Sequence, residues 1–137
     1  MSPRISIENR INRIHSYCQK ISVYSNRSEL AAEGESRYAF ERLAFLIVQS
    51  SIDLVEAIIA MKELRKPETL SDTFEVIREA GIIKSELSER LVRMVGFRNI
   101  LSHDYENISV DRMFREVLAG LVDIEELIAS VKQTIGL

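Results

Sequence analysis

The feature that most constrains this 137-residue chain is the spacing of its apolar residues, which recur every three or four positions along most of the sequence. That period is typical of one face of an α-helix, and no stretch shows the strict alternation expected of a half-buried strand. The final segment has nearly unbroken heptad spacing over Phe114, Val117, Leu121, Ile124, Ile128, Val131 and Ile135. The spacing therefore predicts an all-α fold.

Interruptions of this spacing divide the chain into five helical segments. The first covers about residues 7–21, and the second is predicted from about Arg37 to Arg65, where Pro67 follows and breaks the helix. A short third segment surrounds Phe74, a fourth leads to residues 98–105, and Ser109 is predicted to cap the fifth. Four long amphipathic helices with short connections predict an antiparallel four-helix bundle, with the additional short helix in a crossover.

Length and composition predict one domain, residues 1–137, in which 46% apolar residues are enough for a single core. The longest uncharged run, Leu43–Ile52, is shorter than the ~20 residues that span a bilayer, so no membrane association is expected. The single Cys18 cannot form an intramolecular disulfide, which favours a reducing, cytoplasmic setting. A net charge of −3 gives no general attraction to nucleic acid, so any RNA contact must be local.

The stretch Arg98-Asn99-Ile100-Leu101-Ser102-His103-Asp104-Tyr105 is the strongest candidate for a functional site. Arg98 occupies a position where the apolar pattern calls for a leucine, because the stripe before and after it consists of Leu87, Leu91, Met94 and Leu101. A guanidinium there needs hydrogen-bonding partners, since an unpaired buried charge is costly. A purely structural alternative is an ion pair between Arg98 and Asp53, which lies in the apolar second segment.

The spacing of Arg98 and His103 raises a geometric problem. At ~100° per residue, His103 points roughly 140° away from Arg98 on a continuous helix. Two arrangements remain open. Either the helix ends near Ser102 and the chain turns so that His103 swings back, or the working site combines residues from two copies of the chain.

These residues resemble the HEPN superfamily, and more narrowly the HepT-type toxins with the signature Arg-x4-His-x-Tyr. Here that signature is Arg98, His103 and Tyr105, with Gly96-Phe97 before it. The opening of the second helix, residues 37–42, is also similar to that group, and the resemblance extends over roughly residues 7–127.

The resemblance implies a metal-independent ribonuclease that works as a homodimer, with no cofactor, and with the two motifs facing each other across a cleft. It assigns Arg98 and His103 as the catalytic pair and Asn99 as a polar helper. It also implies a partner, a small nucleotidyltransferase antitoxin that silences the toxin by AMPylation of Tyr105. The overall acidic charge is unusual for a protein that cuts RNA.

The residue types fit this chemistry. RNA supplies its own nucleophile, the 2′-hydroxyl, so cleavage without a metal needs a base and a cation that stabilises the developing phosphorane. His103 is the plausible base, because its unperturbed pKa lies near ~6.5, and Arg98 can hold phosphate oxygens with a planar fork. A different class of function remains open: a non-catalytic helical module that binds a nucleotidyltransferase partner or a nucleotide.

Three other groups are interpreted as structural. His15 has no partner at metal-ligand spacing and is expected at the surface or the edge of the core. Cys18 falls on an apolar stripe and is expected to be a small core residue. Arg37 and Glu41 are four positions apart and are expected to support a helix surface.

Overall fold

The computed structural model describes residues 2–24, 34–103 and 108–137, without the side chains of residues 102 and 103. Within these ranges there is no strand, and the helices are α1 (Pro3–Ile21), α3 (Glu35–Met61), α4 (Asp72–Glu79), α5 (Ser85–His103) and α6 (Val110–Ile135). The predicted all-α fold, with one short helix between the second and the fourth segment, is confirmed.

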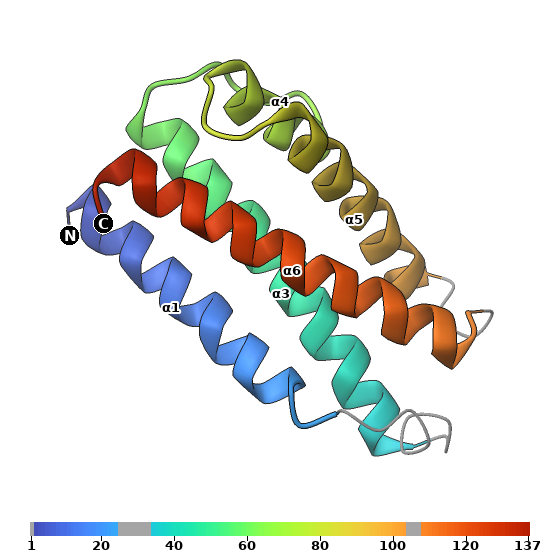
Figure 1. Cartoon of the computed structure of the whole chain (residues 1–137). Helices are drawn as coiled ribbons and strands as arrows, with labels where there is room; N and C mark the ends of the chain where they lie inside the picture. Colours follow the sequence, from blue (N-terminus) through green and yellow to red (C-terminus); the bar gives the residue numbers. More distant parts are fainter. Residues whose placement is uncertain (1, 25–33, 104–107) are drawn as a thin grey trace.

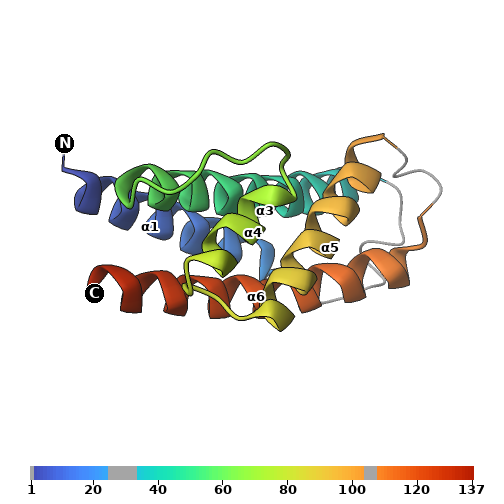
Figure 2. The ribbon, with the colours of Figure 1, turned by 90° about the horizontal axis from the view of Figure 1, so that it is seen from above.

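The long helices form an antiparallel bundle around α3, which contacts each of the other helices (Figures 1 and 2). α1 runs beside α3 in the opposite direction, and α5 and α6 pack against each other on the other side of the bundle. α4 lies in the connection from α3 to α5. Both termini lie at one end of the molecule, where Nη2 of Arg4 donates to the carbonyl oxygen of Gly136 at 3.2 Å.

The core is built from the apolar stripe of each helix, as the periodicity predicts. Fully buried side chains come from α1, α3, α4, α5 and α6, among them Ile14, Ile52, Leu54, Ile58, Phe74, Leu91 and Leu127. α3 is long and apolar enough to cross a membrane by length and composition, but 56% of that apolar window is buried against the rest of the protein. Its composition is therefore that of the central helix of a bundle, which must be apolar on several sides.

The end of α3 differs from the prediction. The helix ends at Met61 and not at Arg65, because Glu63 adopts a left-handed conformation with φ of 54°. The N–H of Leu64 then donates back to the carbonyl of Ile59 at 3.0 Å, as in other left-handed helix ends. A single left-handed residue leaves no periodic signal in the sequence. The helix predicted from the apolar pattern is therefore too long at its C-terminal end.

Arg65 lies beyond the end of α3 and forms ion pairs with α4. Its guanidinium donates to both carboxylate oxygens of Asp72, at 2.7 and 2.9 Å, and to both of Glu79, at 2.9 and 3.0 Å. The hydrogen bond from Arg65 lowers the pKa of Asp72 to about 2. We call this arrangement the Arg65 bridge. It joins the end of α3 to both ends of α4, which packs against α5.

The start of α6 agrees with the prediction. Ser109 is its N-cap, and Oγ of Ser109 accepts a hydrogen bond from the N–H of Arg112 at 3.1 Å. Asp111 lies in the first turn, where a negative charge is favoured by the helix dipole. This cap defines where the chain leaves the motif segment and re-enters the bundle.

Candidate active site

The helix that carries the candidate motif buries the stripe on which Arg98 lies. Leu87, Leu91, Met94 and Leu101 of α5 are all buried, with exposed fractions of 8% or less. Arg98, in the same stripe, is only partly buried, because its long side chain reaches out of the core towards α3. The interruption of the apolar pattern by an arginine therefore marks a polar contact between α5 and α3.

The guanidinium of Arg98 is held by residues of both helices. Its Nη2 donates to Oε1 of Gln49 on α3 at 2.9 Å, and its Nη1 donates to Oδ1 of Asn99 at 3.1 Å. The guanidinium carbon also lies over the ring of Phe45, 4.6 Å from its centre, which is a cation–π distance. Two hydrogen bonds and a ring contact together restrict both the position and the plane of the guanidinium.

Asp53, considered from the sequence as a structural partner of Arg98, makes no direct ion pair with it in the described part of the chain. Oδ1 of Asp53 accepts a hydrogen bond from Nε2 of Gln49 at 3.2 Å, so Gln49 stands between the acid and the arginine. The direct Arg98–Asp53 ion pair considered from the sequence is therefore wrong. The amide of Gln49 is oriented by this contact: its nitrogen faces Asp53, and its oxygen faces Arg98.

Neither Gln49 nor Phe45 was singled out from the sequence. Gln49 did carry a signal, because it has the longest polar side chain in the uncharged run Leu43–Ile52, whose other polar residues are Ser50 and Ser51. A polar side chain in such a run needs a partner when it is turned inward. Phe45 carried none, because an aromatic residue in an apolar run is indistinguishable from a core residue.

The other residues of the motif are Asn99, His103 and Tyr105. Asn99 is exposed, and since its amide oxygen accepts from Arg98, its amide nitrogen is the group left to donate elsewhere. The backbone of α5 is helical up to and including His103, but the His103 side chain lies outside the description. Tyr105 also lies outside the described residues.

The Arg37–Glu41 pair differs from the expectation of a surface contact. Nε of Arg37 donates to Glu41 at 2.9 Å, but the two side chains are only 15% and 10% exposed. Nη2 of Arg37 also donates to the carbonyl of Ile108 at 3.4 Å. The pair therefore ties the start of α3 to the residue that follows the motif segment, a role that spacing along one helix could not reveal.

His15 lies at the edge of the core, as expected, and Cys18 packs against the core without being fully buried. Nε2 of His15 lies 3.7 Å from a carboxylate oxygen of Glu125, at the edge between α1 and α6. Cys18 is partly buried, and burial, with a smaller effect of the negative charge of Glu125, raises the pKa of its thiol to about 11. Such a thiol is protonated at neutral pH and is a poor nucleophile.

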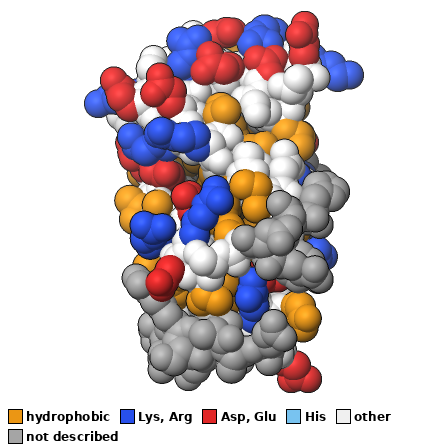
Figure 3. Space-filling model, turned by 90° about the vertical axis from the view of Figure 1, so that its right-hand side faces the viewer, with side chains coloured by type: hydrophobic (Ala, Val, Ile, Leu, Met, Phe, Trp, Pro, Cys, Tyr) orange, Lys and Arg blue, Asp and Glu red, His pale blue; other side chains and the backbone are white. Residues whose placement is uncertain are grey.

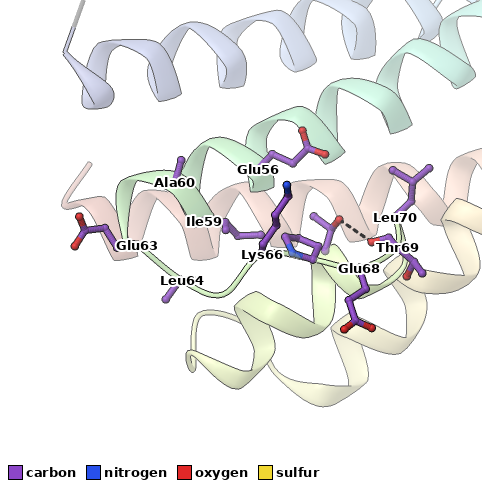
Figure 4. Close-up of a pocket in the computed structure, with 11 residues that line it drawn as sticks. Glu56, Ile59, Ala60, Glu63, Leu64, Lys66, Glu68, Thr69 and Leu70 are labelled. Carbon is purple, nitrogen blue, oxygen red and sulfur yellow. Dashed lines mark hydrogen bonds between the residues drawn. The ribbon is translucent and has the colours of Figure 1, made fainter.

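A cavity of about 720 Å³ lies elsewhere, between the end of α3 and the connection to α4 (Figure 4). Figure 4 shows Lys66 extending from the connection towards α3 on the side of Glu56, whereas Glu63 and Glu68 point away. Neither Arg98 nor any residue that contacts it lines this cavity. The cavity is open, and the charged side chains around it do not point to a common position. The candidate active site is therefore Arg98 with Gln49, Phe45 and Asn99.

The fold and the site together define a class of proteins: antiparallel helical bundles with a partly buried arginine motif at the end of the helix before the last. Comparison with known proteins assigns the family. The model of the HepT-like ribonucleases matches residues 7–131, nearly the whole chain. This chain belongs to the HepT-like ribonuclease family.

Individual relatives agree. The mRNA nuclease HepT of Shewanella oneidensis is 32% identical over 84 residues, which are 61% of this chain and 63% of the relative. The chain thus spans somewhat less than two thirds of that relative. The tRNA nuclease HepT of Aphanizomenon flos-aquae is 27% identical over 119 residues, 85% of this chain and 81% of the relative.

Solved structures are similar over more of the chain. A toxin–antitoxin structure with AMP-PNP is 26% identical, with a TM-score of 0.84 over 93% of this chain and 97% of that one. A tri-AMPylated HEPN toxin of Shewanella oneidensis in complex with an MNT antitoxin is 27% identical, with a TM-score of 0.84 over 93% and 96%. The resemblance to HEPN toxins stated from the motif is confirmed.

Proposed function

We propose that this protein is a metal-independent endoribonuclease, the toxin of a toxin–antitoxin pair, and that Arg98, His103 and Asn99 act on the RNA phosphate. The observation that carries this proposal is the fixed guanidinium of Arg98. Gln49 and Phe45 hold it within an otherwise buried stripe, with the exposed Asn99 beside it. A cation that is already oriented can stabilise a developing charge without reorganisation during the reaction. Membership of a ribonuclease family supports the same assignment.

In the proposed reaction the 2′-hydroxyl of RNA attacks the adjacent phosphorus. His103 takes the hydroxyl proton, while Arg98 and the amide nitrogen of Asn99 bind the non-bridging oxygens as negative charge grows on them. The bond to the 5′-oxygen breaks, and that oxygen takes a proton from a second acid. The products are a 2′,3′-cyclic phosphate and a free 5′-hydroxyl.

We propose that the second acid is His103 of another copy, in a symmetric homodimer. The continuity of α5 through His103 supports this arrangement, because residues 98 and 103 of one ideal helix diverge by roughly 140°. Of the two arrangements left open by the sequence, a site made by two copies is therefore favoured over a helix that ends before His103. A two-fold axis near the motif brings two arginines and two histidines to one cleft.

The direct test is cleavage of RNA by the purified protein. We expect His103→Ala and Arg98→Ala each to abolish cleavage while helical content and oligomeric state stay unchanged, and we expect a 2′,3′-cyclic phosphate end on the product. EDTA should have no effect. If chelation removes activity and a divalent metal restores it, the metal-free mechanism is wrong. If the wild type does not cut RNA, the non-catalytic alternative, a module that binds a nucleotidyltransferase or a nucleotide, takes its place.

We further propose that a nucleotidyltransferase antitoxin silences the protein by AMPylation of Tyr105. The similarity to an AMPylated HEPN toxin in complex with an MNT antitoxin supports this partner. An AMP group on a phenol beside the cleft would repel and block an RNA phosphate. Tyr105→Phe should keep most of its cleavage activity but escape silencing by the co-expressed partner.

Tyr38 offers the matched control, because it is a tyrosine with 58% of its surface exposed. Tyr38→Phe should still be silenced. Mass spectrometry of the co-expressed pair should place the AMP on Tyr105. Modification of Tyr38 instead, or continued silencing of Tyr105→Phe, would contradict the assignment of the acceptor.

A further inference from the structure

One face of α3 carries partly or fully exposed side chains along about four turns. Tyr38, Arg42, Phe45, Gln49 and Asp53 follow each other at spacings of four, three, four and four residues, so they share one side of the helix. Tyr38 and Arg42 are exposed, and the other three are partly buried. We call this set the α3 stripe. The candidate active site described above uses Phe45, Gln49 and Asp53 from it, but neither Tyr38 nor Arg42.

The stripe brings a second arginine close to Arg98. The guanidinium carbon of Arg42 lies 5.4 Å from the centre of the Phe45 ring, and that of Arg98 lies 4.6 Å from the same centre. The two guanidinium carbons are therefore no more than the sum of these distances, about 10 Å, apart. Two cations around one aromatic ring repel each other, so an anion near both of them would be favoured.

Arg42 has no evident structural purpose. In the described part of the chain it makes the ring contact with Phe45 and no ion pair, in contrast to Arg65 and Arg90, each of which binds two carboxylates. An exposed arginine fixed over an aromatic ring keeps its donors directed at solvent. Such a group is suited to binding a phosphate that arrives from outside.

Tyr38 extends the same surface by one turn beyond Arg42. Its ring is 58% exposed, which is a large area for an aromatic side chain. Alternating aromatic rings and arginines are the usual surface for a single nucleic-acid strand, since bases stack on the rings and phosphates bind the cations. Figure 3 shows the side of the molecule where α5 ends: positive and hydrophobic side chains lie side by side in its middle, with some negative ones between them, and charges of both signs cover the end near α4.

We propose that Arg42 and Tyr38 form a binding subsite for single-stranded RNA next to Arg98. In this subsite Arg42 binds a phosphate other than the one that is cleaved, and Tyr38 stacks on an unpaired base. This inference rests on the proposed ribonuclease function. It adds a direction: the strand runs from Arg98 along α3 towards the start of that helix.

The test measures binding of a short single-stranded RNA to the His103→Ala protein over a range of salt concentrations. Each phosphate neutralised on a single strand contributes about 0.7 to the slope of log K against log salt. Arg42→Ala should make that slope shallower by about this amount, and Arg42→Lys should largely restore it. Arg13→Ala, an exposed arginine on α1, is the matched control and should leave the slope unchanged.

Two further measurements separate the parts of the subsite. Tyr38→Leu should weaken binding by about tenfold with no change in the salt slope, because stacking is not electrostatic. In the active protein, Arg42→Ala should raise KM more than it lowers kcat. A duplex of the same sequence should bind less tightly than the single strand.

The outcomes distinguish this inference from the proposed function. If the wild type cleaves RNA but Arg42→Ala shows the slope and KM of the wild type, the subsite is wrong and the ribonuclease assignment stands. If the duplex binds as tightly as the single strand, stacking on Tyr38 is wrong. If the wild type neither binds nor cleaves RNA, both proposals are overturned.

Discussion

Arg98 depends on a neutral residue for its orientation. Gln49 carries no net charge, and its amide oxygen accepts from Nη2 of Arg98 while its amide nitrogen donates to Asp53. Asp53 therefore orients the guanidinium through Gln49, and the plane of the guanidinium is fixed before a phosphate arrives.

Replacing Gln49 should separate activity from folding. A hydrogen bond to a charged group contributes about 1.5–3 kcal/mol, so Gln49→Leu should lower kcat/KM for RNA by about 10- to 100-fold. Helical content should not change, because leucine fits an apolar run. Gln19→Leu, on the exposed side of α1, is the control. Steady-state kinetics check this, and a Gln49→Leu protein with wild-type kcat would show that Arg98 needs no orientation.

At the scale of the elements, the helix boundaries next to the motif are set by specific side chains. The hydroxyl of Ser109 caps α6 immediately after the motif segment. Ser109→Ala should lower the free energy of unfolding by about 1 kcal/mol, whereas Ser109→Gly should cost only a few tenths. Urea denaturation of the two variants measures the difference. Equal losses for alanine and glycine would mean that the hydroxyl does not stabilise the helix.

The Arg65 bridge predicts a pH dependence of stability. The pKa of Asp72 is lowered to about 2 and that of Glu79 is lowered as well, in both cases first of all by hydrogen bonds from Arg65. A carboxylate with a lowered pKa in the folded state stabilises the protein above its unfolded pKa, and that contribution is lost as the pH falls towards the folded pKa. Stability should therefore decline between about pH 5 and pH 2.

Arg65→Gln isolates this effect. The variant should have a lower Tm at pH 7 and a smaller further loss on acidification, because Asp72 and Glu79 lose the main cause of their lowered pKa values. Thermal unfolding at several pH values gives the comparison. Arg13→Gln is the control, since Arg13 is an exposed arginine on α1. Parallel Tm curves for wild type and Arg65→Gln would contradict a role of the bridge.

At the scale of the whole molecule, the proposed shared cleft predicts how activity depends on subunit composition. If both His103 residues of a dimer are needed, a dimer with one His103→Ala subunit is inactive. After subunit exchange, activity should then fall with the square of the wild-type fraction, to about a quarter in an equal mixture. If each subunit had an independent site, the equal mixture would keep about half of the wild-type activity. The same mixture before exchange, which contains only wild-type and variant homodimers, is the control.

The fold was predictable because it follows from a repeated signal. Apolar residues at helical spacing predicted the number, the order and the packing faces of the helices, and Ser109 predicted where α6 begins. Arg98 was predictable as an interruption of that spacing. Its partners were not, because a contact between α3 and α5 depends on the three-dimensional packing of segments 49 residues apart in sequence. The C-terminal end of α3 was also not predictable, because the conformation of a single residue, Glu63, ends the helix.

The α3 stripe places the proposed RNA contacts and the residues that stabilise the bundle on different sides of one helix. Residues on the neighbouring faces of α3, such as Ala44, Val48 and Ile52, are buried and hold the bundle together. Tyr38 and Arg42 are exposed instead, so their replacement leaves the core intact. If these two positions contact RNA as proposed, substitutions there can change the preference for RNA without a cost in folding stability.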